Sequence, residues 1–581
     1  MESEENTRWR WYIITMKKTQ FACLAGIAGL VPACFVIGSV LSGTAAALTV
    51  TVDSGKTYQT FEGWGTSLCW WAVTAGSWKA ENRSALIGAI VDPDTGLGYT
   101  CFRYNIGGGD NPSHTHLKGE RAVPGFKPTE TGNYDWSADQ AQRNILLGIA
   151  ARDPNCIFEA FSNSPPWWMT ISGCASGNTD GADNLKATYF TAFADYLATV
   201  VRHYRDEWGI PFRTVEPFNE PSSGYWKVNG GQEGCGFKNN QSKMVVELGK
   251  KLEEKGLFPD AMVSAADETA LDQAVTGIKS YSDSALHYLS QINSHSYGGW
   301  GSRKALYDIA VKQKKNLWQS ESGPLGKNDN SDIAMWMSDV IIQDLRVLKA
   351  NAWIDWQVGD PVGDWQTIGL NGTAQTFKYT KRYYMHAAFS RFIRPGSRII
   401  SSSDTNSLAA IVPSTGNVVI VLRNSASGPA AYTVDLTKCA PDAATAQMYR
   451  FALPGSLTRI DDEKIDNMKF TFSAPGQTIT TCVIPRPVAI RQRQSVMQSS
   501  AIRMSQRDGR GAVRLVFNKP SPYVFRLFDV GGKLVFERYG CPDRPEVRLA
   551  IASAGLSNGL YLAEVRTENA VASGEKIYLF R

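Results

Sequence analysis

The sequence predicts an α/β fold: a (β/α)8 TIM barrel with a side β-sandwich, followed by a small C-terminal all-β domain. Eight short apolar runs alternate with helical patterns between residues 60 and 390, which is the order of a parallel barrel. Two of these runs end near a glutamate that is soon followed by proline, and barrel proteins place their chemistry at that strand end. After residue 395 the pattern changes to short alternating strands, and 581 residues exceed one compact core.

The first 47 residues predict an export signal. Met16-Lys17-Lys18 is a basic start, residues 21–41 are an apolar run, and Ala45-Ala46-Ala47 offers small residues for cleavage. Met16 is a candidate for the true start, because residues 1–15 fit no signal pattern. The apolar run is also long enough to span a membrane, so an uncleaved anchor is the alternative.

Residues 60–390 are expected to form the barrel. One predicted helix, 188–204, places its apolar side chains on a single face, and 241–255 does the same with Gly256 as its C-cap. A third is expected over 332–350, with Ser331 as N-cap. The expected strands are 60–66, 100–105, 156–161, 213–219, 262–266, 291–296, 315–320 and 352–357.

The rest of the chain is predicted to be β-structure and one linker. Strand-like runs separated by Gly, Pro, Asn and Asp turns indicate a side β-sandwich over 391–485, completed by residues 48–59. Residues 486–512 are an Arg-rich linker, interpreted as a solvated spacer rather than a basic binding segment. Residues 513–581 alternate around tight glycine turns and form the C-terminal β domain.

Charge and cysteine content narrow the function classes. The net charge of +5 comes from an excess of basic residues in the C-terminal tail, so the chain does not resemble a nucleic-acid-binding protein. Eight cysteines follow the signal segment, an even number that permits disulfides in an oxidising compartment. The pairs Cys174–Cys235 and Cys439–Cys482 are expected, and the protein is expected to be a monomer.

Two glutamates are the predicted catalytic pair. Glu220 follows Asn219 at the end of the fourth expected strand, and Glu321 follows the seventh. A retaining glycosidase uses two carboxyl groups about 5–5.5 Å apart, one as nucleophile and one as acid and base. We assign Glu220 as acid/base, Glu321 as nucleophile and Asn219 as a substrate-binding residue. Glu216 competes with Glu220, but it is expected lower in the strand as a buried or ion-paired group.

Residues at other strand ends complete the expected site. Arg103 ends the second strand and would hold the nucleophile ionised through charge-assisted hydrogen bonds. Tyr297, after the sixth strand, would hydrogen-bond the nucleophile. His295 is expected either to reach a sugar hydroxyl or to be a satisfied structural histidine. Trp356, in the eighth strand, would form a floor for the sugar.

Tryptophan is concentrated in the barrel region. Of 17 tryptophans, 15 lie between Trp64 and Trp365, and about half are expected in the core. The pairs Trp70-Trp71 and Trp167-Trp168 cannot both point inward from one strand. We therefore expect Trp71 and Trp167 to line a substrate cleft.

No cofactor or metal is expected. The run Gly107-Gly108-Gly109 lacks the spacing of a phosphate loop. His114-Thr115-His116 suggests a metal-binding pair, but without a third ligand nearby it is interpreted as loop surface.

Residues 48–485 resemble glycoside hydrolase family 30, whose fold is a (β/α)8 barrel with a side β-sandwich built from both ends of the catalytic region. The resemblance implies that Glu220 is the acid/base and Glu321 the nucleophile. Its tryptophan-rich first motif is most similar to endo-β-1,6-galactanases, which cut side chains of type II arabinogalactans. The motifs that carry it are Phe61-Glu62-Gly63-Trp64-Gly65-Thr66-Ser67-Leu68-Cys69-Trp70-Trp71-Ala72, Ser164-Pro165-Pro166-Trp167-Trp168-Met169, Pro217-Phe218-Asn219-Glu220-Pro221, Trp318-Gln319-Ser320-Glu321 and Pro475-Gly476-Gln477-Thr478-Ile479-Thr480-Thr481.

Residues 513–581 resemble the C-terminal sorting domain of the type IX secretion system of Bacteroidetes-like bacteria. The resemblance implies a bacterial protein that is secreted or held at the cell surface, with the secretion machinery as a partner. An accessory carbohydrate-binding sandwich is the alternative, but the tail has no tryptophan for a sugar platform. The motifs are Leu527-Phe528-Asp529-Val530-Gly531-Gly532-Lys533-Leu534-Val535, Leu556-Ser557-Asn558-Gly559-Leu560-Tyr561 and Lys576-Ile577-Tyr578-Leu579.

These observations predict an exported retaining endo-glycosidase that hydrolyses β-1,6-galactan by double displacement. A glucuronoxylanase or a β-1,6-glucanase of the same family is the alternative within enzymes. A non-catalytic surface glycan-binding protein is the alternative from another class, although such a binder has no need for both glutamates.

Overall fold

The computed structural model describes residues 47–485, apart from 325–329, 361–364, 440–442 and 454, together with a set of C-terminal strands. The predicted signal peptide therefore lies outside the described residues, except for its last residue. Most of the Arg-rich linker lies outside them as well. The C-terminal segments described are 502–506, 512–517, 522–529, 534–540, 546–550, 559–567 and 570–579.

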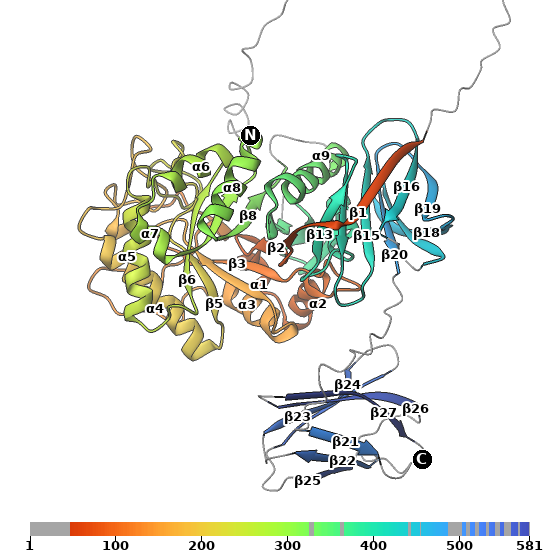
Figure 1. The fold of residues 1–581 in the computed structure, drawn as a ribbon. Helices are drawn as coiled ribbons and strands as arrows, with labels where there is room; N and C mark the ends of the chain where they lie inside the picture. Colours follow the sequence, from red (N-terminus) through yellow and green to blue (C-terminus); the bar gives the residue numbers. More distant parts are fainter. Residues whose placement is uncertain are drawn as a thin grey trace, which may run out of the picture. The chain divides into compact units, whose positions relative to one another are not determined.

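Eight parallel strands close into a barrel, as the sequence predicts (Figure 1). Each strand is short and largely buried, because one face packs into the barrel and the other against the surrounding helices. The strands are β2 (Gly63–Ser67), β3 (Cys101–Asn105), β4 (Ile157–Phe161), β5 (Phe212–Glu216), β6 (Met262–Glu268), β7 (Leu289–His295), β8 (Asn316–Ser322) and β9 (Ala352–Gln357).

Helices surround the barrel and connect its strands. They are α1 (Trp71–Gly76), α2 (Ala80–Val91), α3 (Gln140–Arg152), α4 (Phe190–Trp208), α5 (Gln241–Glu254), α6 (Leu271–Lys279), α7 (Asp283–Tyr288), α8 (Arg303–Gln313), α9 (Asn330–Gln343) and α10 (Lys381–Ser390). Helix α4 buries the predicted apolar face, and α9 begins one residue before the expected N-cap Ser331. Among the described residues, no helix combines the length and apolar character needed to cross a membrane.

One carboxylate fastens the N-terminal end of the barrel. Glu62, just before β2, accepts hydrogen bonds from both terminal guanidinium nitrogens of Arg213 on β5, each at 3.0 Å. It also accepts from the Asn316 side chain at 2.8 Å and the Trp318 indole at 2.6 Å, both on β8. Burial raises the pKa of Glu62, but Arg213 and these donors outweigh it and lower the pKa below its usual value. One side chain thus joins three parts of the ring.

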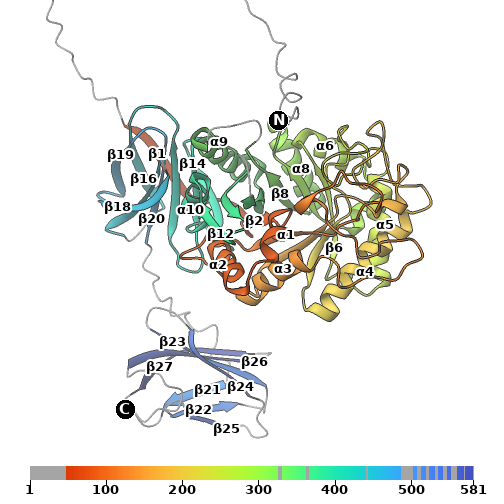
Figure 2. The same cartoon turned by 180° about the vertical axis from the view of Figure 1, so that it is seen from behind.

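A nine-stranded sheet stands beside the barrel, and the N-terminal strand β1 (Leu48–Thr60) lies inside it (Figure 2). β1 pairs with strands near residues 400 and 434, so the sheet is built from both ends of the region. In addition to β1, it contains β13 (Arg398–Ser402), β14 (Ser407–Ile411), β15 (Val418–Asn424), β16 (Ala430–Lys438), β17 (Thr445–Ala452), β18 (Ser456–Lys464), β19 (Lys469–Ala474) and β20 (Thr478–Ile484). A separate three-stranded sheet contains β10 (Gly359–Asp360), β11 (Ile368–Asn371) and β12 (Thr376–Tyr379).

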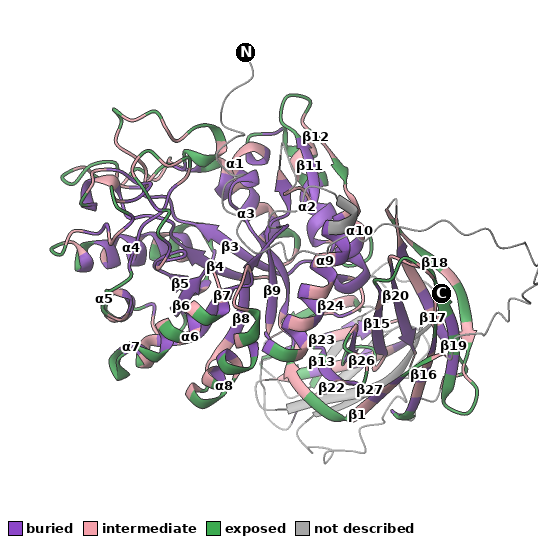
Figure 3. Cartoon of the chain, turned by 90° about the horizontal axis from the view of Figure 1, so that it is seen from above, coloured by how far each residue is buried: buried purple, intermediate pink, exposed green. Residues whose placement is uncertain are grey.

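The central strands of the nine-stranded sheet are buried on both faces, whereas β16, β18 and β19 also have exposed residues (Figure 3). One face encloses its own apolar core, to which strands from both ends of the sheet contribute side chains such as Val434 and Met448. The other face contributes Val421, Phe451 and Ile479 to the core that also contains the barrel helices. The shared core fixes the side domain against α10, and this contact is why the two fold as one unit.

The C-terminal strands form two sheets around a separate core. The sheets are β21 (Ile502–Gln506), β22 (Ala512–Phe517) and β25 (Glu546–Ala550), and β24 (Leu534–Gly540), β23 (Tyr523–Phe528), β26 (Gly559–Thr567) and β27 (Ala570–Leu579). Leu515 from the first sheet and Phe525 from the second share one apolar cluster. The segment expected to be linker is therefore not all linker: it contains β21, whose five residues pair with β22.

Neither predicted disulfide forms. Cys174 and Cys235 are both buried free thiols, and so is Cys482, the expected partner of Cys439. Cys174 Sγ lies 3.4 Å from His116 Nε2, while Cys235 Sγ contacts the Gly236 carbonyl at 3.6 Å. An even cysteine count does not say which thiols have the geometry to pair.

Candidate active site

Glu220 and Glu321 converge at the C-terminal end of the barrel. Glu220 lies four residues beyond the end of β5, and Glu321 lies on β8 one residue before its end. One carboxylate oxygen from each, and one ring nitrogen of His295, all lie within 4.8 Å of one another. Both glutamates are largely buried, at 7% and 5% exposure, so each carboxyl has a small face open to a ligand.

Glu321 is surrounded by donors. The Tyr297 hydroxyl donates to Glu321 Oε1 at 3.0 Å, the hydrogen bond that the sequence suggested. His295 Nδ1 lies 3.4 Å from the same oxygen, and Arg103 lies 3.7 Å from Oε2. Burial raises the pKa of Glu321, the Glu220 carboxylate adds to that rise, and His295 and Arg103 only partly oppose it.

The backbone at Glu220 has an unusual conformation that directs its carboxyl group toward the site. Its φ of 47° is in the left-handed region, which is uncommon for residues other than glycine. The Glu220 amide donates to the Asp267 carbonyl at 2.8 Å, and the Trp226 indole donates to the Glu220 carbonyl at 2.9 Å. Its carboxylate accepts a hydrogen bond from the Tyr225 hydroxyl and contacts His295 Nδ1 at 3.0 Å. These contacts hold the turn.

His295 lies between three carboxylates and is fully buried. Nδ1 contacts Glu220 and Glu321, and Nε2 lies 3.3 Å from Asp267 Oδ1. Burial lowers the pKa of His295, but the carboxylates more than offset this and raise it to about 10. The ring is therefore a cation at neutral pH, which neither of the two sequence hypotheses described. Because both nitrogens then carry protons, neither offers a lone pair to a metal ion.

Asp267 is a site residue that sequence reasoning missed. It follows directly after the predicted strand 262–266, so its position at a strand end was the available signal. Asp267 accepts from Arg103 at 2.5 Å and from the Ser320 hydroxyl at 2.6 Å. Burial raises its pKa, but Arg103 and His295 outweigh that and hold it well below the usual range. Its negative charge adds to that of Glu321 in raising the pKa of His295.

Arg103 lies beneath the carboxylates rather than on a substrate-facing surface. It is fully buried, and its Nε donates to Glu159 Oε1 at 2.8 Å. The expected hydrogen bond to Glu321 is replaced by a longer ion pair, because Asp267 and Glu159 hold the guanidinium more closely.

Glu216, the competitor for Glu220, is also fully buried in the barrel, where burial raises its pKa well above the usual value. Glu216 accepts a hydrogen bond from the Asn293 side chain at 3.2 Å.

Trp71 is not in a cleft, contrary to the expectation. It is fully buried in the main core, and its indole donates to the Ser67 carbonyl at 2.8 Å. The alternation rule for strands does not apply there because Trp71 begins α1. Trp70 instead packs edge-to-face on Trp356, with ring centroids 5.3 Å apart, and Arg121 lies over its ring.

Aromatic rings and one free acceptor complete the site. Trp356, 7% exposed, belongs to a cluster with Trp70 and the partly buried Trp365. Sequence reasoning did not identify Trp365 as a site residue. Trp167 is partly exposed and donates to the Pro128 carbonyl at 3.1 Å. Asn219 is 4% exposed, and its Oδ1 has no hydrogen-bond partner among the described residues, which leaves it available to a substrate hydroxyl.

The charge on His295 leads to a testable pH dependence. Its pKa is higher in the folded chain than the ordinary 6.5, so its stabilising effect is complete below pH 6.5 and is lost as pH rises through about 10. Between these pH values His295 should make the free energy of unfolding of the wild type fall by up to about 1.4 kcal/mol per pH unit. We expect His295→Asn to abolish this part of the slope. Thermal unfolding of both proteins from pH 6 to 10 measures this difference.

His203→Asn is the control, because His203 stacks on Trp136 away from the site and its pKa is lowered by burial. The control should follow the wild-type pH curve. A His295 ring signal that titrates below pH 7 in NMR spectra would contradict the assignment.

Comparison with known proteins identifies the family. The sequence model of O-glycosyl hydrolase family 30 matches residues 47–364. An endo-β-1,6-galactanase of Hypocrea rufa is 32% identical, over 74% of this chain and 94% of its own length. An exo-β-1,6-galactobiohydrolase of Bifidobacterium longum is 24% identical, over 71% of this chain and 37% of its own. A conserved exported protein from Bacteroides fragilis has the same fold, with a TM-score of 0.67 and 20% identity over 75% of this chain and all of its own. The chain belongs to glycoside hydrolase family 30.

Proposed function

We propose that this glycoside hydrolase acts with retention of configuration, by double displacement between Glu321 and Glu220. The observation that carries the proposal is that oxygens of the two carboxyls lie within 4.8 Å. Retaining enzymes hold their carboxyls about 5–5.5 Å apart, whereas inverting enzymes leave about 6.5–9.5 Å for a water molecule. The short separation favours direct attack by one carboxylate on the sugar.

The surroundings favour Glu321 as the nucleophile. Two cations, Arg103 and His295, and the Tyr297 hydroxyl stabilise its carboxylate, whereas Glu220 contacts one of these cations. Glu220 gives a proton to the leaving oxygen in the first step, while Glu321 forms an ester bond to the sugar. In the second step the Glu220 carboxylate takes a proton from the water that displaces Glu321. The two carboxyls thus supply both halves of the reaction.

We propose β-1,6-galactan side chains of arabinogalactan as the substrate, cut internally. The names of both reported relatives specify β-1,6-linked galactose. The endo-acting one is more similar and is matched over nearly its whole length, which favours internal cleavage. The flat rings of Trp70, Trp356 and Trp365 suit the apolar faces of sugars. Glucuronoxylan and β-1,6-glucan are the alternative substrates.

A non-catalytic glycan-binding role is less consistent with the site. Burying carboxylates and their counter-ions costs several kcal/mol per ion before pairing offsets the loss. A binding surface gains nothing from two glutamates with such close oxygens and a protonated His295 between them, whereas acid–base chemistry requires this arrangement.

We also propose that the protein is exported, and that the C-terminal β domain directs it through type IX secretion. The basic start and apolar run within residues 16–47 support the first step. The sandwich formed by the C-terminal strands is compatible with the second. N-terminal sequencing of protein recovered from cells and medium, with and without residues 502–581, tests both: full-length protein retained in the cytoplasm would contradict them.

The two glutamates should respond differently to substitution. We expect Glu220→Gln to lower kcat about 10²–10⁴-fold on a natural glycan, because general acid catalysis is lost. Azide should restore turnover of an aryl glycoside by this variant, with a β-glycosyl azide as product. Glu321→Gln should remove activity that azide does not restore as a β-product. Kinetics and product NMR measure both effects.

Glu207→Gln, an exposed carboxyl on α4, is the matched control and should leave kcat unchanged. Direct formation of the α-anomer by the unmodified enzyme would show inversion and contradict the proposed mechanism.

Substrate choice is tested by a panel of three polymers. We expect oligosaccharides of mixed length to appear early from de-arabinosylated arabinogalactan, because internal cuts release long products first. Glucuronoxylan and pustulan should yield little or nothing. Chromatography of early time points measures product size. Release of disaccharide alone would show exo action in place of endo action. Products from xylan alone, or from pustulan alone, would show that polymer to be the substrate in place of galactan.

A further inference from the structure

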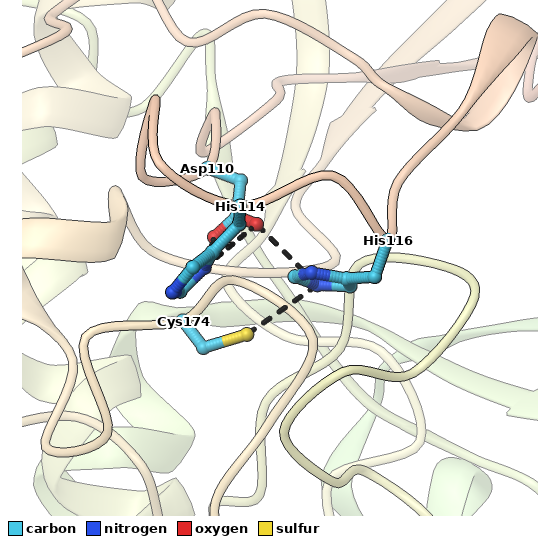
Figure 4. A group of neighbouring side chains, drawn as sticks. All are labelled: Asp110, His114, His116 and Cys174. Atoms are coloured by element: carbon cyan, nitrogen blue, oxygen red, sulfur yellow. Dashed lines mark hydrogen bonds and ion pairs between the residues drawn. The ribbon is translucent and has the colours of Figure 1, made fainter.

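We propose that Asp110, His114, His116 and Cys174 bind a zinc ion that joins two loops at the substrate end of the barrel. The first three residues lie in the loop after β3, and Cys174 lies in the loop after β4. Figure 4 shows the four side chains pointing toward a common centre. One ligand atom from each lies within 4.8 Å of those of all the others. Two nitrogens, one sulfur and one carboxylate oxygen form a set that zinc accepts.

Three of the six ligand-to-ligand distances in this cluster are close to the edge of a zinc tetrahedron, and the other three are within 4.8 Å. With zinc bonds of about 2.0–2.3 Å, neighbouring ligand atoms should lie about 3.3–3.6 Å apart. Asp110 Oδ2 is 3.1 Å from His114 Nδ1 and 3.3 Å from His116 Nε2. His116 Nε2 is 3.4 Å from Cys174 Sγ. A small expansion around a central ion therefore produces the required geometry.

Hydrogen bonding alone accounts for these contacts less well. His116 Nε2 faces both the Asp110 carboxylate and the Cys174 sulfur. If this nitrogen carries a proton, that proton serves one of the two acceptors; if it does not, its lone pair accepts from the Cys174 thiol and also faces the lone pairs of the Asp110 oxygen. A central cation satisfies the nitrogen, the oxygen and the sulfur together.

The surroundings hold the ligands in place. The other oxygen of Asp110 accepts from the Ala175 amide at 2.9 Å, which leaves Oδ2 for the centre. Cys174 is fully buried, and its amide donates to the Ser172 hydroxyl at 3.2 Å. The Asp110 and His116 side chains are each 12% exposed, and His114 is 26% exposed, so an ion enters from the His114 side. Four protein ligands fill a zinc tetrahedron, which indicates a structural site with no position for substrate.

The site would stabilise loops that build the substrate cleft. The Gly234 amide donates to the Ala175 carbonyl at 2.9 Å, so a third loop is attached to Cys174's neighbour. In that third loop, Glu233 accepts from Asn105 and from the Gly108 amide, and Tyr225 contacts the catalytic Glu220. Zinc at this position would link the loops after β3, β4 and β5 without touching the reacting sugar.

Metal analysis of the full chain tests the proposal directly. Wild-type protein dialysed against zinc and then against buffer should retain about one zinc per chain by elemental analysis. Cobalt in place of zinc should give a thiolate-to-metal absorption band in the near ultraviolet. Cys174→Ser and His116→Ala should each lose that band and most of the zinc. Cys156→Ser is the matched control, since this cysteine lies outside the cluster, and it should keep both signals.

The wild-type protein decides the question even if a variant folds poorly. A dialysed wild-type chain that contains less than a tenth of an equivalent of zinc overturns the proposal, as does zinc that persists in both ligand variants. Chelation should lower the melting temperature of the wild type and of Cys156→Ser, and should not lower that of Cys174→Ser. An equal shift in all three would also overturn it, because the ion would then be bound elsewhere.

Discussion

The C-terminal end of this barrel depends on two buried cations held among four carboxylates. Arg103 and His295 have no exposed surface, and neither charge would be stable there without Asp267, Glu159, Glu220 and Glu321. Conversely, Glu220 and Glu321 can lie close together because positive charge lies between and beneath them. Removal of one partner from such a group leaves an uncompensated buried charge, which costs about 3–5 kcal/mol. Stability and chemistry therefore rest on the same contacts.

Asp267 contacts both buried cations. One of its oxygens lies 3.3 Å from His295 Nε2, and the other accepts from Arg103. Its backbone carbonyl also accepts from the Glu220 amide and holds the left-handed turn. One residue near the end of β6 thus contacts both cations and the backbone that positions Glu220.

Sequence patterns predicted the features that depend on local order. Strand periodicity located the barrel, and a glutamate at a strand end placed Glu220 and Glu321 at the same end of it, because parallel strands share a direction. The charge of His295 could not be predicted, since it comes from Glu321 and Asp267 on neighbouring strands and from Glu220 in the loop after β5. Trp71 was misplaced because the rule of alternating faces assumes a strand, and the chain there turns into α1.

Cys174 illustrates a second limit of sequence reasoning, and it also shows what these loops require. Its expected partner was Cys235, yet its sulfur faces His116, a residue of a different loop. Asp110 stands four residues before His114, so the sequence could have suggested it as a third ligand. The fourth, Cys174, comes from the loop after the next strand and is not apparent from the sequence. A disulfide and a metal ion both fasten loops that have little apolar core of their own. A thiol can serve only one of them, and the contacts of Cys174 point to the metal.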